Sequence, residues 1–230
     1  MKLVYICSAY DAETPEEMER GRQSALAACA EAYQFGRLGG QFIVPVTPLV
    51  NFAYFGENDP AERGWARKLG LALMSKCGEL WVAGENFSEG MRGEIRAAAR
   101  LGLPVFSMGM AQEKIQAAID GMPPMLDERS CLKGSDRADY TGQLLALKPS
   151  ALAPWAMEPE NQLWLAESGF GLSPTARGRA VYAACLYDGE KARFDRSDFL
   201  GIADREKLPD WADDKLTEFE QNMEESEEWE

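Results

Sequence analysis

The sequence predicts a doubly wound α/β domain with a mainly parallel sheet, followed by a small, mostly helical C-terminal appendage. Short apolar runs alternate with amphipathic helical patterns through the first 121 residues, and capping residues precede the helices. After Gly121 this alternation ends, and the proline-rich stretch that follows is typical of a connector. We therefore expect an α/β domain over residues 1–121, a connector over 122–159, and a helical region with an acidic tail over 160–230.

The first elements are indicated by local signals. Residues 2–8 form an apolar run with β-branched and aromatic members, which predicts a buried strand. Thr14-Pro15-Glu16-Glu17 is a capping box with proline in the first helical turn, so a helix should follow and end at the glycines of residues 36–40. Residues 41–46 predict a second strand. The loop expected at 47–58 is more apolar than a solvated loop needs to be.

The same alternation continues beyond that loop. Asp59-Pro60-Ala61-Glu62 predicts a helix over residues 60–76, and Ser88 is expected to cap another that ends near Gly102. The remaining expected elements of the domain are strands at 79–83 and 103–108 and a helix at 112–119. Right-handed crossovers would cover both faces of such a sheet, which is a Rossmann- or flavodoxin-like arrangement. In the C-terminal region, helices are expected at 174–187 and 208–223.

Composition excludes several classes of function. The chain has no histidine, which removes Ser-His and Cys-His nucleophile pairs and the commonest metal ligand, and its five cysteines are scattered. We expect no metal, no cofactor and a reducing, cytoplasmic setting. The net charge is −14, the last 21 residues hold ten acidic residues and one lysine, and no basic stripe exists. Duplex nucleic acid is therefore not an expected partner, and neither is a membrane, because no apolar run is long enough to span one.

Ligands of open α/β sheets bind outside the carboxyl ends of the strands. The most informative loop at that edge leads into Ser88, Gly90 and Glu94. A helix start that offers a hydroxyl group, exposed N–H groups and a glycine suits an anion. A carboxylate on the second helical turn can act as nucleophile or base. Together they suggest a sugar phosphate. The alternative is that Ser88 only caps the helix, Gly90 only packs, and Glu94 is solvated.

Residues 77–106, CGELWVAGENFSEGMRGEIRAAARLGLPVF, taken with the opening KLVYICSAY, resemble the nucleoside 2-deoxyribosyltransferase superfamily. More closely, they resemble its DUF4406 and DUF7768 branch. The resemblance covers about residues 1–110. The S-x-G-x-x-x-E spelling of residues 88–94 is similar to that of 2'-deoxynucleoside 5'-phosphate N-hydrolases.

The resemblance implies roles for individual residues. Glu94 would be the carboxylate nucleophile and Tyr5 the hydroxyl that positions it, while Ser88 and Gly90 would contact phosphate or ribose. The expected substrate contacts are Ser8, Tyr10, Asp11, Ser88, Gly90 and Met91. The sequence departs from the active families at Gly70, where they carry an aspartate, and at Asp11, where the phosphate hydrolases carry a basic residue. These departures bear on glycosidic cleavage more than on binding, and Asp11 or Glu13 would have to protonate the leaving group.

Three functions follow as alternatives. The first is an N-glycosidase or deoxyribosyltransferase that acts on a deoxynucleoside or its 5'-monophosphate. The second is a module that binds a small-molecule nucleotide or nucleoside without turnover. The third is an interaction protein that uses the acidic C-terminal region around Trp211. A homo-oligomer is left open, because neighbouring subunits complete the site in related transferases.

Overall fold

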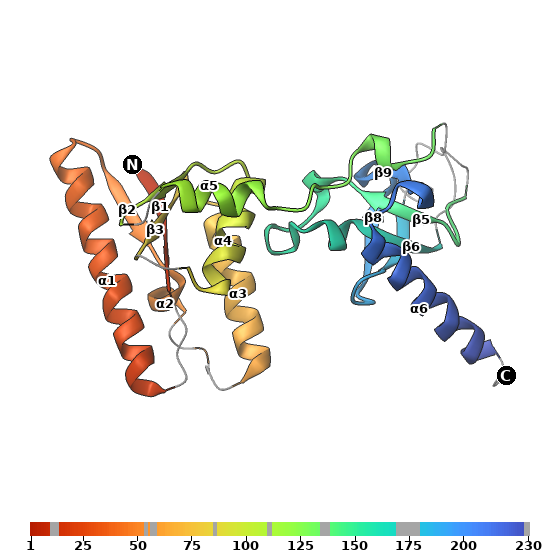
Figure 1. The fold of residues 1–230 in the computed structure, drawn as a ribbon, viewed down its shortest axis with the longest axis horizontal. Coiled ribbons are helices and arrows are strands. Elements are labelled where there is room, and N and C mark those ends of the chain that lie inside the picture. The colour runs from red at the N-terminus through yellow and green to blue at the C-terminus, as the bar shows by residue number, and fades with distance from the viewer. Residues whose placement is uncertain are drawn as a thin grey trace. The chain divides into compact units, whose positions relative to one another are not determined.

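The computed structural model describes residues 1–9, 14–52, 55, 59–84, 87–109, 112–133, 139–168 and 180–227. Tyr10 and Asp11, two of the expected substrate contacts, and Glu13 lie outside these residues. The chain divides into two compact units (Figure 1). The first comprises Met1–Met122 with Ala153–Trp155, and the second Pro123–Leu152 with Ala156–Glu230.

The first unit contains a four-stranded parallel sheet with the strand order β2-β1-β3-β4. Its strands are β1 (Lys2–Ser8), β2 (Ile43–Val46), β3 (Glu79–Ala83) and β4 (Val105–Ser107). Strand β1 pairs with β2 on one side and β3 on the other. The chain therefore moves from β1 to one neighbour and then crosses back to its opposite side, which separates the loops that follow β1 and β3.

Helices lie on either side of this sheet (Figure 1). Which helix packs on which face follows the alternation of side chains along β1. Val4 and Ile6 pack with helix α1 (Pro15–Leu38), whereas Tyr5 and Cys7 belong to the cluster on the opposite face. The helices that pack on that opposite face are α3 (Pro60–Met74), α4 (Glu89–Arg100) and α5 (Gln112–Asp120). The α/β class predicted for this part of the chain is thus observed.

The helix starts follow the capping residues. Thr14 accepts a hydrogen bond from the Glu17 N–H at 3.3 Å while the Glu17 side chain accepts one from the Thr14 N–H at 3.2 Å, which completes the predicted capping box. Asp59 accepts from the Ala61 N–H at 2.8 Å, and Ser88 caps α4. The expected loop at 47–58 instead begins with a one-turn helix, α2 (Pro48–Asn51).

The second unit is built on a five-stranded antiparallel sheet with the order β8-β7-β6-β5-β9. Its strands are β5 (Leu144–Leu147), β6 (Leu163–Ser168), β7 (Ala180–Cys185), β8 (Lys191–Asp195) and β9 (Phe199–Ile202), and its helix is α6 (Asp210–Glu227). Short 3-10 turns of this unit lie at Glu128–Ser130, Pro149–Ala151, Pro159–Gln162, Arg196–Asp198 and Arg205–Lys207.

The prediction of a mostly helical C-terminal region is wrong. Residues 160–230 contain four strands, the expected connector contains β5, and the helix expected at 174–187 is strand β7 where the structure describes it. Leucine and alanine dominate these strands, and short apolar runs of such residues do not distinguish a buried strand from a helix. The helix expected at 208–223 agrees with α6.

Two clusters of side chains cover the faces of the antiparallel sheet. On one face, Phe194 packs edge-on against Trp164 and Phe199, with ring centroids 4.6 and 5.4 Å away. On the other, α6 buries Ala212 and Leu216, and Trp211 packs partly buried against the same cluster. Trp211 is therefore at least partly a core residue of this unit.

Gln162 is a polar residue with no exposed surface in the second unit. Its Oε1 accepts a hydrogen bond from the Leu126 N–H at 2.7 Å, and its Nε2 donates to the carbonyls of Leu126 and Leu147 at 3.1 and 2.8 Å. One side chain thereby satisfies three buried backbone groups and fixes the segment around Leu126 to strand β5.

Candidate functional site

A pocket of about 260 Å³ lies at the carboxyl ends of β1 and β2 and between helices α3 and α4. Its volume is just below the ~300–1,000 Å³ typical of small-molecule sites, which fits a compact ligand. Five of the residues predicted from sequence line it: Ser8, Ser88, Gly90, Met91 and Glu94. The pocket is thus placed where parallel sheets bind their ligands.

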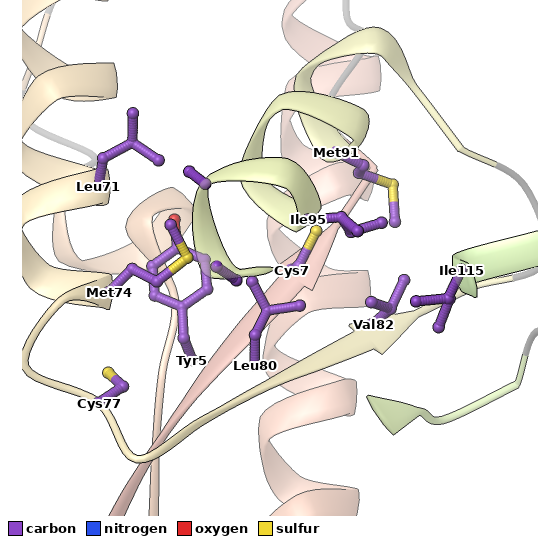
Figure 2. Close-up of a cluster of buried hydrophobic side chains, with 12 residues drawn as sticks. Tyr5, Cys7, Leu71, Met74, Cys77, Leu80, Val82, Met91, Ile95 and Ile115 are labelled. Carbon is purple, nitrogen blue, oxygen red and sulfur yellow. The ribbon is translucent and has the colours of Figure 1, made fainter. Parts of the chain in front are cut away.

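Tyr5 and Glu94, 89 positions apart in the sequence, are joined directly. The buried Tyr5 hydroxyl donates a hydrogen bond to Glu94 Oε1 at 2.7 Å. Cys7, on the same face of β1, is also buried and hydrogen-bonds Glu94. Figure 2 shows Tyr5 and Cys7 in the cluster between the sheet and the helices. Two side chains of a central strand therefore orient the carboxylate.

Burial governs the protonation of this group. It raises the pKa of Glu94, and the hydrogen bonds from Cys7 and Tyr5 and the positive charge of Arg67 oppose that rise. Burial, followed by the charge of Glu94, also raises the pKa of Tyr5 and that of Cys7 well above their ordinary values. Tyr5 and Cys7 therefore keep their protons, and each serves as a donor to the carboxylate.

The start of α4 forms the neighbouring wall. Ser88 Oγ accepts a hydrogen bond from the Met91 N–H at 3.3 Å, so Ser88 is a helix cap as well as a pocket residue. A Cβ atom on Gly90 would meet only Ser88 Oγ, at an ordinary 3.7 Å, so packing does not require glycine there. Met91 is 1% exposed and lies largely in the core.

Sequence reasoning missed the wall supplied by residues 47–67. Thr47, Phe52, Phe55, Arg63 and Arg67 all line the pocket. The unusual apolarity of the expected loop was the available signal for the phenylalanines. The arginines lie four residues apart on α3, a spacing that places them on one helical face.

Gly70 lies at the floor of the pocket, beside the tyrosine. A Cβ atom there would be 3.3 Å from the Tyr5 Oη atom and 3.4 Å from Pro48 Cβ. Gly70, near which the resemblance leads us to expect an acid, is thus next to the hydroxyl that holds Glu94.

Replacing Gly70 by alanine should move Tyr5 away from Glu94. Alanine favours a helix by about 1 kcal/mol over glycine, but the new methyl group crowds the tyrosine oxygen. We expect Gly70→Ala to stabilise the chain less than Gly64→Ala, because nothing lies within 4 Å of a Cβ on Gly64 of the same helix. Urea denaturation measures both. Equal gains would contradict a close approach to Tyr5.

Thr47 carries a hydroxyl that its own fold does not use. Thr47 is 2% exposed, and its Oγ1 has no hydrogen-bond partner in the structure, although it precedes α2. Its backbone N–H instead donates to Asn51 Oδ1 at 3.2 Å.

We therefore expect Thr47→Val to leave stability unchanged or to raise it by about 1 kcal/mol, since an unpaired buried hydroxyl is removed. Thermal denaturation without ligand checks this expectation. A loss of more than about 1 kcal/mol would mean that the hydroxyl has a structural partner after all.

The described residues hold no group of three or more Cys, Asp or Glu side chains arranged to bind a metal ion. None of the helices in this part of the chain has both the length and the hydrophobicity required to cross a bilayer.

A comparison with known protein families gives a match within the first unit. A family model described as a domain of unknown function, DUF7768, matches residues 2–108, which include the whole parallel sheet and Glu94. No curated protein and no solved structure shows significant similarity to the chain. The DUF7768 part of the expected resemblance is thus confirmed, whereas its link to the deoxyribosyltransferases remains a prediction.

Proposed function

We propose that the first unit, of the doubly wound Rossmann- or flavodoxin-like type, binds a nucleoside or a deoxynucleoside 5'-monophosphate in the pocket around Glu94. The hydrogen bond between Tyr5 and Glu94 is the observation that carries the proposal. A carboxylate partly shielded from water, oriented by a central strand and next to an open helix start, is suited to a sugar phosphate and has no evident structural purpose.

The same arrangement supports cleavage of the N-glycosidic bond. Ionised Glu94 would attack the anomeric carbon, and the bond from that carbon to the base would break with its electron pair passing to the base. The base would take up a proton from Asp11, Glu13 or solvent as it leaves. Water would then hydrolyse the glycosyl ester and regenerate the carboxylate. Transfer to a second base in place of water would give deoxyribosyl transfer. Tyr5 and Cys7 would act as positioning residues by holding the attacking oxygen in place.

Gly70 favours a second candidate, binding without turnover. The acid that the active families carry there is missing, and a glycine cannot protonate a leaving base. In that case the pocket would recognise a nucleotide as a signal and return it unchanged.

A panel of deoxynucleosides and their 5'-monophosphates separates these candidates. Ligands that raise the melting temperature further as their concentration increases bind the folded state. Chromatography of the recovered ligand then shows whether free base has been released. Stabilisation with intact ligand supports the binding module, and base release supports the enzyme. If no compound raises the melting temperature and none releases its base, the proposed function is overturned.

A further inference from the structure

Two buried hydroxyl groups in the pocket have no hydrogen-bond partner among the described residues. Ser8 Oγ is at the end of β1 and Thr47 Oγ1 directly follows β2, and each is shielded from solvent without a hydrogen bond in the structure. These strands are adjacent and parallel, so their carboxyl ends meet at one edge of the sheet. Burying a hydroxyl without a partner costs about 1–3 kcal/mol, which indicates that a ligand supplies the missing partners.

The two arginines of α3 lie on the wall above these hydroxyls. Arg67 reaches across to α4, where a Cβ atom on Gly93 would be 3.2 Å from its Nη2 atom. Its charge lowers the pKa of Glu94, yet neither Arg63 nor Arg67 forms an ion pair with a described residue. Among the described residues that line the pocket, two carry a guanidinium group and one, Glu94, carries a carboxylate.

We infer that Arg63, Arg67 and Thr47 form an anion subsite on the α3 side of the pocket, with Ser8 at its edge. All four side chains can donate hydrogen bonds, and guanidinium and hydroxyl donors together match an acceptor-rich group such as phosphate. The inference rests on the proposed function and deepens it. The ligand would be the deoxynucleoside 5'-monophosphate in preference to the free nucleoside, and its phosphate would be held by α3 as well as by the start of α4.

The subsite also explains how an acidic chain admits an anion. The net charge of −14 repels phosphate at long range, so binding must depend on local donors. Arg63 and Arg67 are exposed at their outer surfaces yet contribute to the pocket lining, which makes them accessible to an incoming ligand.

Calorimetry on the full chain tests the inference with matched pairs of deoxynucleosides and 5'-monophosphates. The wild type should bind a monophosphate about tenfold or more tightly than its nucleoside. Arg63→Gln and Arg67→Gln should each weaken monophosphate binding about tenfold, and the double variant should bind both compounds alike. Lys68→Gln is the control, because it removes the same charge from the same helix at a residue outside the pocket lining.

The outcomes separate the subsite from the proposed function. Monophosphate binding that survives in the double variant, or that weakens equally in Lys68→Gln, overturns the subsite and leaves nucleotide binding standing. If no nucleoside or nucleotide binds, inorganic phosphate is titrated against chloride of equal ionic strength in thermal shift. Stabilisation by phosphate that is lost in the double variant then supports the subsite while the proposed function fails. If phosphate does not stabilise the protein, both the subsite and the proposed function are overturned.

Discussion

Replacing Glu94 by glutamine is expected to abolish base release from any deoxynucleotide that the wild type cleaves. Glutamine keeps the shape of the side chain and can still accept the hydrogen bond from Tyr5, but it cannot form a glycosyl ester. The rate of release should fall at least about a thousandfold, while the dissociation constant changes far less. Single-turnover chromatography and calorimetry measure the two quantities separately.

The same substitution should make the protein more stable at neutral pH. Because burial raises the pKa of Glu94, the folded state binds a proton more tightly than the unfolded state does. Wild-type stability should therefore fall as the pH rises from the unfolded value of about 4.3 through the raised folded value. Glu94→Gln lacks this ionisation. Its free energy of unfolding should therefore exceed that of the wild type by an amount that grows between the unfolded and the folded pKa of Glu94 and then levels off.

Glu89→Gln provides the matched control on the same helix. Glu89 is exposed, and its Oε2 atom lies 3.8 Å from Arg92 Nε in a surface ion pair. Such pairs contribute little, so its removal should change neither base release nor the pH profile of stability appreciably. Substantial activity in Glu94→Gln would show that another group attacks the sugar. A pH profile identical to that of the wild type would show that Glu94 does not titrate abnormally.

The second large effect is expected in the other unit, at Gln162. Gln162→Ala removes three hydrogen bonds and leaves the backbone groups of Leu126 and Leu147 unpaired in the interior. It also leaves a cavity. We expect a loss of about 3 kcal/mol or more in the free energy of unfolding of this unit. Urea denaturation followed by circular dichroism measures the loss, with a second transition resolved if the two units unfold separately.

A shape-conserving variant isolates the hydrogen bonds at this position. Gln162→Glu fills the same space but, when ionised, cannot donate to either carbonyl, whereas its protonated form can restore one donor. It should be less destabilised at pH 4 than at pH 7. Gln116→Ala, at an exposed position on α5, should cost less than about 1 kcal/mol. Similar losses in the Gln116 and Gln162 variants would contradict the structural role of Gln162.

The sequence predicts the first unit better than the second. The signals for the first unit are local, whereas the structure of the second depends on segments distant in the sequence. In the first, the starts of α1, α3 and α4 are marked by the local caps Thr14, Asp59 and Ser88, and the strands by short apolar runs, so local patterns predict these elements. In the second, strands such as β5 with the sequence LLAL have no strand-specific composition. Their conformation depends on neighbours distant in the sequence, which no local pattern records.

The candidate site shows the same contrast. Ser88, Gly90 and Glu94 follow one another within seven residues, so their convergence on a helix start could be foreseen. Thr47 and Arg67 could not be foreseen, because the place of Thr47 depends on how β2 pairs with β1 and that of Arg67 on how α3 packs against α4. The link between Tyr5 and Glu94 was expected from the resemblance, and the structure places them in hydrogen-bonding distance.

The attachment of Glu94 to β1 has an evolutionary consequence. The strand that holds the carboxylate has partners on both sides, whereas α2 and the first turns of α3 and α4 supply the other walls. Natural variants can therefore exchange wall residues while Glu94 Oε1 stays in register with the sheet. This separation would let one scaffold diversify its specificity without rebuilding its chemistry.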